Sequence, residues 1–450
     1  MKKILALASA LAFSISISSQ SLSYNDLGVL LSHDDNYGTA RFNAMSGAFG
    51  ALGGDVSSIG INPAGGVIAL KNQTSITLGN RATDLTSNYY GTSLNYQDSF
   101  FHIPQIGAVL VFDTNNSSGW SRFALSTNYR LKKDYNSFFE AEGNSNLLSY
   151  TEHPNDIKTV PSIFDRSLSQ SFYSNRSGES SVLNIGLSAV HNNKLYVGGA
   201  LNFHEFEFGN ITSFTERNDD VDGNILRAQE YVETYIQGNG FSLSLGLIYK
   251  FDQNVRFGLA YETPTWYQEV IQDYYDEISI EHIPDLNIDS YYDLIGPETY
   301  LFSFRSPSRI TASAAYVFGK NGLISADYTF KDYTNIKFYN NDFRTTNRNF
   351  GINYRDTHTV NIGTEWRFDN LSIRGGYRYE KDPNLLAGGN TNKDNIRSFS
   401  TGLGYNFGNT KIDLGYTQSE NKTFYSIYRT GDVNVDQSTT RITGTITFSL

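Results

Sequence analysis

Hydrophobic and polar residues alternate along most of this chain, and two kinds of connection join the alternating segments. The short connections run from Asp113 to Gly119, His191 to Lys194, Phe251 to Asn254, Phe318 to Gly322, Phe368 to Asn370 and Phe407 to Lys411. Longer polar stretches lie between them. Strands that cross a bilayer pair antiparallel with their sequence neighbours, so outer-membrane barrels carry short turns at one rim and longer loops at the other. The sequence therefore predicts a transmembrane β-barrel.

Single segments show the same two-residue period. Apolar side chains occupy every second position from Phe241 to Tyr249, and small or polar ones lie between them. Residues 442–450 alternate more cleanly, and this last strand reaches Leu450. A soluble β-sandwich also alternates, with its apolar face inside. The loop pattern, a secretory signal, the 31 tyrosines and 30 phenylalanines, and the last strand together favour the membrane barrel.

The first residues predict export. Residues 1–18 form a signal peptide with Lys2 and Lys3, an apolar run, and small residues at Ser16 and Ser18. The chain has no cysteine, which excludes a lipoprotein anchor, disulfides and thiolate chemistry. Beyond the signal there is no apolar stretch long enough for a transmembrane helix. A net charge of −11 argues against a nucleic-acid partner. The expected location is the outer membrane of a Gram-negative bacterium.

Using the turns as punctuation, we expect fourteen antiparallel strands. They are placed at residues 70–88, 103–113, 119–132, 180–191, 194–214, 229–251, 254–272, 298–318, 322–337, 356–368, 370–382, 394–407, 410–424 and 438–450. An even number returns the chain to the periplasmic side. Fourteen tilted strands close a cylinder on the order of 27 Å across, which would leak unless something filled it.

The segment before the first strand is the predicted filling. We divide the chain into the signal peptide, a hatch or plug at residues 19–68, and a barrel at residues 69–450. Helical spacing places Phe42, Met45, Phe49 and Leu52 on one side of the hatch, and Gly53-Gly54 ends or bends it. A mobile periplasmic tail or a small soluble cap is the alternative, but the apolar content of the segment argues against a solvated tail.

The run from Ala40 to Asp55, followed by residues 57–65 with Asn62-Pro63-Ala64, resembles the N-terminal hatch of the FadL/TodX-type long-chain fatty-acid transporters of the outer membrane. Tyr261-Glu262-Thr263-Pro264, Arg305 to Arg309 and Gly322 to Tyr328 look like later strands of the branch found in Bacteroidetes-type bacteria. The resemblance covers essentially the whole mature chain. Two departures are the terminal Leu450, where such barrels commonly end in an aromatic residue that the barrel-assembly machinery recognises, and a polar loop without a clear apolar groove between the third and fourth strands.

The resemblance implies passive uptake. A hydrophobic molecule is captured outside, released by a hatch rearrangement, and leaves sideways through the barrel wall. It assigns hatch and gating roles to Asn62, Pro63 and Ala64, although an ordinary turn is the alternative. The candidate ligand contacts are Phe42 and Phe49 in the hatch, and Arg374 and Arg378 among the inward charges, which more often pair with one another or with a plug.

Other chemistry has weaker support. Asn218, Asp220, Asp222 and Gly223 imitate the start of an EF-hand, but the residue at the bidentate position is Gln229, so an acidic loop tip is the better interpretation. The aromatic and acidic stretch from Asp273 to Tyr300 suits either a cover over a ligand entrance or an outer girdle with a solvated loop. Seven histidines are scattered, and His204 near Glu205 and Glu207 is the only mild hint of hydrolysis.

The sequence thus predicts a non-enzymatic channel without cofactor or metal. Its expected partners are a hydrophobic ligand such as a fatty acid, the surrounding lipid and lipopolysaccharide, and the barrel-assembly machinery during biogenesis. The alternative is a non-transporting scaffold barrel that binds protein partners, for example in a secretion system. Identity of the compound, the position of any wall opening and the oligomeric state remain open at this level.

Overall fold

A computed structural model describes residues 22–114, 119–156, 162–283, 289–385, 395–426 and 431–449. The predicted signal peptide, the middle of the turn from Asp113 to Gly119, and Leu450 lie outside these ranges. Among the described residues, no helix is long and apolar enough to cross a membrane.

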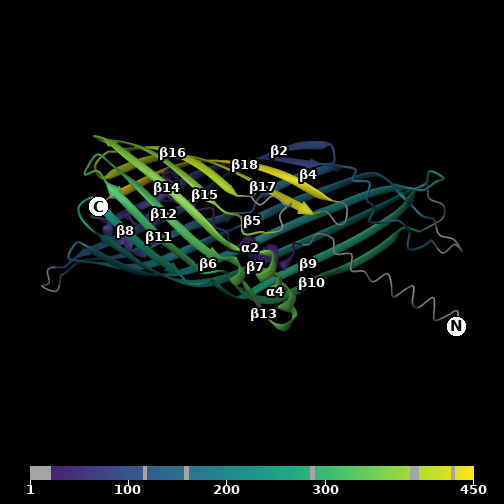
Figure 1. The fold of residues 1–450 in the computed structure, drawn as a ribbon, viewed down its shortest axis with the longest axis horizontal. Coiled ribbons are helices and arrows are strands. Elements are labelled where there is room, and N and C mark those ends of the chain that lie inside the picture. Colours follow the sequence, from purple (N-terminus) through teal and green to yellow (C-terminus); the bar gives the residue numbers. More distant parts are fainter. Residues whose placement is uncertain are drawn as a thin grey trace.

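Most of the chain is one antiparallel sheet that closes on itself (Figure 1). Its strands are β1 (Gln73–Tyr89), β2 (Thr92–Asp113), β3 (Trp120–Asp134), β4 (Ser137–Gly143), β5 (Arg166–His191), β6 (Leu195–Asp219), β7 (Ile225–Lys250), β8 (Val255–Glu262), β9 (Trp266–Ile283), β10 (Tyr291–Arg305), β11 (Arg309–Val317), β12 (Gly322–Asp332), β13 (Lys337–Tyr339), β14 (Asp356–Phe368), β15 (Leu371–Glu380), β16 (Ile396–Asn406), β17 (Thr410–Ser426) and β18 (Asp432–Ser449).

Four wall strands are each interrupted once, which reconciles these segments with a fourteen-stranded barrel. β3 and β4 both pair with β5, β8 and β9 both pair with β7, and β10 with β11 and β12 with β13 likewise continue one another. β18 pairs with β1 from Gln73↔Ser449 to Asn88↔Asn434 and closes the ring. The predicted fold class and strand number are confirmed.

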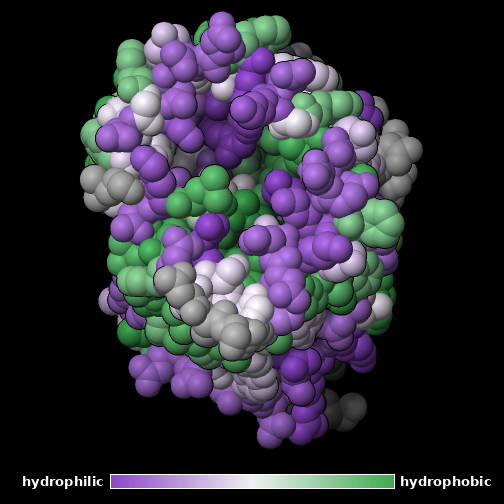
Figure 2. Space-filling view, turned by 90° about the vertical axis from the view of Figure 1, so that its left-hand side faces the viewer, coloured by the Kyte–Doolittle hydropathy of each residue, from purple (hydrophilic) through white to green (hydrophobic). Residues whose placement is uncertain are grey.

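The alternating side chains settle which face is apolar. On β7, Ser242 and Ser244 are buried inward, whereas Leu243, Leu245 and Leu247 are exposed on the outside. The same division recurs around the ring. A soluble β-sandwich would hide these leucines, so their exposure marks a lipid-facing band. In the view onto the end that carries the short turns, hydrophilic residues gather over the rim and hydrophobic ones lie between them and along the flanks (Figure 2).

At the end of the barrel away from the short turns, the expected strand bounds are wrong because several strands are longer than predicted. β2 begins at Thr92, β5 at Arg166 and β10 at Tyr291, and β9 continues to Ile283, so much of the expected loop from Asp273 to Tyr300 is strand. The reason is that both faces are polar there, while the ladder hydrogen bonds still satisfy the backbone. β5, β6, β7, β9 and β10 rise beyond the other strands at the end away from the C-terminus, and we call these five the tall wall (Figure 1).

The chain before β1 lies inside the barrel, and we call residues 22–72 the plug. It contains α2 (Tyr24–Ser32), α3 (Ala40–Ala44) and the 3-10 helices η1 (Val56–Gly60) and η2 (Pro63–Ile68). Ser23, Thr39, Asp55 and Asn62 cap these helices with their side chains. The remaining helical elements, η3 (Tyr333–Asn335), η4 (Asn341–Phe343) and α4 (Arg344–Asn353), lie between β12 and β14.

The expected helix from Phe42 to Leu52 is not formed. α3 ends at Ala44, and Ser46 and Gly47 turn the chain with φ of 51° and 75°. Phe42, Met45, Phe49 and Leu52 nevertheless meet in one buried cluster with Ala315 and Leu323 of the wall. The turn, rather than a helix, brings them together. Gly53 and Gly54 also have positive φ, which confirms the expected bend there.

Candidate functional site

The Asn62-Pro63-Ala64 turn is docked on the inner wall. The Asn62 side-chain amide donates to the backbone oxygens of Gly50 (2.8 Å) and Leu247 (3.1 Å), and its oxygen accepts from the backbone N–H of Ala64. Gly198 of β6 and Gly246 of β7 leave the room, because a Cβ on Gly246 would lie 2.0 Å from the Asn62 Oδ1 atom and one on Gly198 would lie 2.6 Å from the Ala64 nitrogen. These contacts are suited to a gating role, which stays a prediction.

Two groups of ion pairs hold the plug. In the first, Asp34 is bidentate to Arg130 at 2.7 and 2.9 Å, and the Asp35 carboxylate lies 3.3 Å from Lys133. Burial alone would raise the pKa of Asp34, but the Arg130 guanidinium, helped by Arg309 and Lys331, outweighs it and holds that pKa well below its usual range. Because removing one partner of a buried pair leaves an uncompensated charge, these contacts tie the plug firmly to β3.

The second group surrounds Glu365 on β14. Arg41 of the plug and Arg374 of β15 each reach its carboxylate at 2.7 Å, and Arg374 also pairs with Asp413 at 2.7 Å. Arg374, a predicted ligand contact, is therefore already paired with two carboxylates of the wall. The rings of Phe42 and Phe49 lie 5.4 Å apart between centroids at a tilted angle and are almost fully buried, so they pack the plug.

A cavity of about 280 Å³ lies between the plug and the inner wall, and we call it the lumen chamber. Its cationic lining is Arg81, Lys133, Arg176, Arg378 and Arg441. Among the described residues that line it, Asp35 and Asp134 carry carboxylates. Of the four predicted ligand contacts, Arg378 alone is in this lining.

Two guanidinium groups of the lumen chamber pair with no carboxylate among the described residues. Arg441 lies 4.4 Å above the Tyr37 ring and donates to the backbone oxygen of Asp35. Arg176 lies 4.9 Å from the Tyr425 ring and donates to Asn210. Sequence reasoning missed both, because they lie in segments that had been assigned to loops or to the polar start of the last strand. An anionic group entering the chamber would meet these two cations.

The chamber borders an apolar region. Leu30, Tyr135 and Phe208 line it, and the last two belong to a large buried cluster that α2 shares with β6, β7, β9, β10, β13 and α4. In that cluster Tyr24 makes edge contacts with Phe302, Phe338 and Phe343 at 4.9–5.7 Å between ring centroids. Cationic and apolar walls thus meet where α2 lies.

The ring of backbone pairing has an interruption beside the chamber, which we call the seam. β2 pairs with β3 only from Gln105↔Arg130 to Asp113↔Arg122, and residues 92–104 of β2 form no ladder with β3 or β4. The outer face of β4 overlaps the inner face of β2 instead, with Tyr96 against Phe138 (5.0 Å) and its hydroxyl on Glu140 (3.0 Å).

Arg81 of β1 bridges the seam. It lies 2.6 Å from Asp98 on β2 and 2.7 Å from Asp134 at the end of β3. Just below, Tyr37 of the plug makes an edge contact with His102 of β2, 5.6 Å between ring centroids. Phe101 and Ile103 point outward there and are exposed in the lipid-facing band. At the seam, side-chain contacts of Arg81, Tyr37 and Tyr96 therefore stand in place of the missing backbone ladder.

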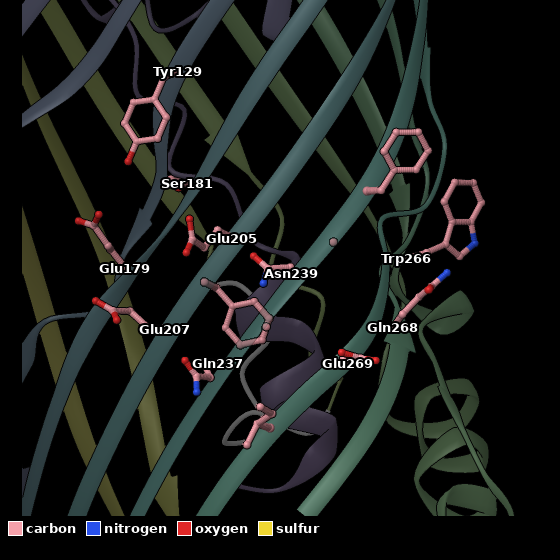
Figure 3. Close-up of a pocket in the computed structure, with 15 residues that line it drawn as sticks. Tyr129, Glu179, Ser181, Glu205, Glu207, Gln237, Asn239, Trp266, Gln268 and Glu269 are labelled. Carbon is pink, nitrogen blue, oxygen red and sulfur yellow. The ribbon is translucent and has the colours of Figure 1, made fainter.

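The hydrolytic arrangement is not assembled. His204 points inward and its Nε2 atom lies 2.9 Å from the Ser242 Oγ atom, but Glu262 interacts with that serine and not with the other histidine nitrogen. Glu205 and Glu207 point to the opposite, outer face, where with Glu179, Glu269 and Trp266 they line a hollow of about 990 Å³ (Figure 3). The EF-hand-like stretch is a tight turn in which Asp220 accepts from Asp222 and Asn224.

Comparison with solved structures shows that this fold is similar to that of outer-membrane channels of the FadL/TodX type. A FadL homologue of Pseudomonas aeruginosa matches with a TM-score of 0.57 and 15% identity, over 91% of this chain and 98% of the other. The toluene transporter TodX of Pseudomonas putida matches at 0.55 and 15% over 93% and 99%.

A third structure, the monoaromatic hydrocarbon channel CymD, matches with a TM-score of 0.51 and 14% identity, over 93% of this chain and 98% of the other. No family model and no curated protein matches the sequence. At such identities the likeness establishes the fold. It leaves the compound carried, and the suggested Bacteroidetes-type branch, as predictions.

Proposed function

We propose that this protein takes up hydrophobic small molecules with an anionic head group, such as long-chain fatty acids, by passive diffusion gated by the plug. The observation that carries the proposal is the lumen chamber, where Arg176 and Arg441 line a cavity next to the apolar cluster around α2. A carboxylate would bind the guanidinium groups, and its chain would gain roughly 0.8 kcal/mol for each methylene buried against that cluster.

The seam supports a lateral exit. A molecule that leaves the chamber between β2 and β3 passes the Arg81 bridge and enters the bilayer without returning its chain to water. Release requires Tyr37 to move away from His102. The plug can shift only when its ion pairs to β3 and its Asn62 turn on β7 give way. The wall opening and the hatch residues thus serve one pathway.

Uptake of labelled oleate tests the proposal. Cells that lack the protein are compared with cells that carry the native protein or a Pro63→Leu hatch variant, after surface expression is verified. We expect a gain with the native protein that the variant loses. Equal uptake in all three would discard fatty-acid transport.

A second comparison separates the head group from the chain. Replacing Arg176 and Arg441 together by glutamine should lower oleate uptake severalfold and leave methyl oleate uptake unchanged, because the ester has no charge for the guanidinium groups to bind. Arg227→Gln, on an exposed pair with Glu281 of the tall wall, is the matched control. Equal losses for acid and ester would contradict a head-group role.

A further inference from the structure

The tall wall ends in a strand with a free edge. On one side, β10 pairs with β9 from Tyr291↔Ile280 to Arg305↔Trp266. On the other side, only Ser303 to Arg305 pair, with β13. No described residue forms a backbone ladder with residues 291–302 on that second side. About half of the N–H and C=O groups of an edge strand point away from its one neighbour, so this stretch can pair with another chain.

Apolar side chains are exposed along the same edge. Tyr292, Leu294 and Leu301 lie on the outer face and are 63%, 56% and 69% exposed, and Ile295 on the inner face is 46% exposed. Native proteins protect such an edge by covering it, by placing lysine or proline there, or by a β-bulge. Residues 291–302 contain no lysine, and the one proline, Pro297, lies in a bulge between Ile295 and Glu298. The two flanking stretches, 291–295 and 298–302, keep a regular ladder to β9 except for a second shift at Phe302.

The edge lies outside the lipid. Trp266 and Glu269 lie near each other on the outer face of neighbouring β9 (Figure 3). Farther along the strand the outward positions include Ile271 and then Asp273 and Glu277, so acidic side chains replace the apolar band beyond Trp266. Residues 291–301 pair with β9 beyond that level. A protein in the surrounding medium can therefore reach them.

Charge selects the occupant. β9 carries Glu269, Asp273, Asp276, Glu277 and Glu281, the β10 edge adds Asp293 and Glu298, and neither β9 nor residues 291–302 contain lysine or arginine. A second copy that paired edge to edge would bring Asp293 and Glu298 of both copies together, and like charges on adjacent strands are unfavourable. A basic strand would meet complementary charge instead.

We propose that the β10 edge is a docking site for an extended, basic segment of a partner protein, which adds as a further strand to the tall wall. Backbone hydrogen bonds supply the affinity, lysine or arginine side chains meet Asp293 and Glu298, and alternate apolar side chains cover Leu294 and Leu301. The site is independent of the lumen, so it stands whether or not the channel carries fatty acids.

Binding of a synthetic peptide to the purified full chain in detergent tests the site. The probe is a labelled ten-residue peptide of alternating lysine and valine, measured by fluorescence anisotropy. Its counterpart carries N-methyl groups on every second residue, which keeps the charge and removes hydrogen-bond donors. We expect the first to bind and the second to bind at least about tenfold more weakly. Equal binding of both would overturn strand addition and leave a charge effect only.

Two sets of variants localise the contact. Asp293→Lys with Glu298→Lys should weaken the lysine–valine peptide at least about tenfold, whereas Asp84→Lys with Glu420→Lys should not, because β1 and β17 are paired on both sides at those positions. The chain has no cysteine, so Leu301→Cys gives a single thiol for disulfide capture of a cysteine-bearing peptide. Capture by Tyr235→Cys, on a strand paired on both sides, with none by Leu301→Cys would also overturn the proposal.

Discussion

At the scale of single residues, Asn62 joins three parts of the molecule. Its side chain holds the plug turn at Gly50, the wall strand β7 at Leu247, and its own 3-10 helix at Ala64. At the point of contact the wall has two glycines, Gly198 and Gly246, which leave space for the turn. The docking of the plug therefore depends on missing volume in the barrel as much as on polar contacts.

The first prediction concerns this missing volume. Gly246→Ala places a methyl group 2.0 Å from the Asn62 Oδ1 atom and should force the turn away from the wall, at a cost of about 1–3 kcal/mol. The expected result is a rise in single-channel conductance in planar bilayers. Gly199→Ala is the control, since its Cβ would lie no closer than 3.6 Å to any neighbour. Similar conductance for the two variants would contradict the role of the turn.

The second prediction concerns the seam. Arg81→Gln removes the bridge between Asp98 and Asp134 and leaves the seam without its ionic contact. We expect faster transfer of a labelled hydrophobic ligand into the bilayer of reconstituted vesicles. Arg122→Gln, on an exposed pair with Asp113 near the short turns, should leave the rate unchanged. A slower rate with Arg81→Gln would mean that the arginine guides ligands instead of closing the seam.

At the scale of elements, packing and charge hold adjacent parts of the plug. α2 lies among aromatic side chains, and Gly28 lets it approach them, since a Cβ there would lie 2.9 Å from the Phe350 ring. In the three residues that follow α2, Asp34 and Asp35 carry the ion pairs to β3, and His33 lies 3.5 Å from Glu380 of β15. Protonation of these carboxylates is therefore one way to loosen the plug.

The third prediction follows from the lowered pKa of Asp34. A carboxyl group whose pKa is depressed in the docked state stabilises that state fully above its ordinary value of 3.8, and the stabilisation is lost as the pH falls below it. Conductance should therefore stay constant from pH 8 to pH 5 and rise only below about 4. Asp34→Asn should conduct at neutral pH, because it leaves Arg130 buried without its carboxylate. A rise between pH 7 and pH 5 would point to another group.

The strands show where sequence patterns stop being informative. Within the lipid, one face must be apolar, so residues such as Leu243, Leu245 and Leu247 predict both the strand and its orientation. In the tall wall both faces are wet, and Asp273 to Glu277 resemble a loop although they pair with β7. The lumen chamber was out of reach for the same reason, because Arg176 lies in such an extension and meets Arg441 only through ring closure.

At the scale of the whole molecule, the sequence was sufficient for the number of strands and for the inward charges. It was insufficient for the seam. The seam arises because β4 lies inward of β2, and this position produces no periodic pattern of apolar and polar residues in the sequence. Pairing of distant charges such as Asp34 with Arg130 is likewise a property of the closed ring. Local patterns thus predict the wall, and only the assembled barrel defines the passages through it.

The fourth prediction tests the position of the barrel in the membrane. Leu245 lies midway along the apolar run of β7, so Leu245→Arg should lower the free energy of unfolding in lipid vesicles by about 2–4 kcal/mol. Glu205→Arg, outward on β6 beyond the band, should change it by less than about 1 kcal/mol. Urea titration followed by tryptophan fluorescence gives both values. Equal costs would mean that the band is displaced along the barrel.

Ring closure around the plug has a consequence for biogenesis. The backbone N–H of Ala40 in the plug donates to Thr445 of β18, and Thr445 in turn contacts Thr77 of β1, at the junction where the first and last strands meet. We expect a finished cylinder to leave no room for inserting this segment afterwards. On that expectation, the N-terminal segment takes its place while the cylinder is still an open sheet, and β18 pairs with β1 last. A plug supplied as a separate peptide should fail to rescue a barrel that has already closed without it.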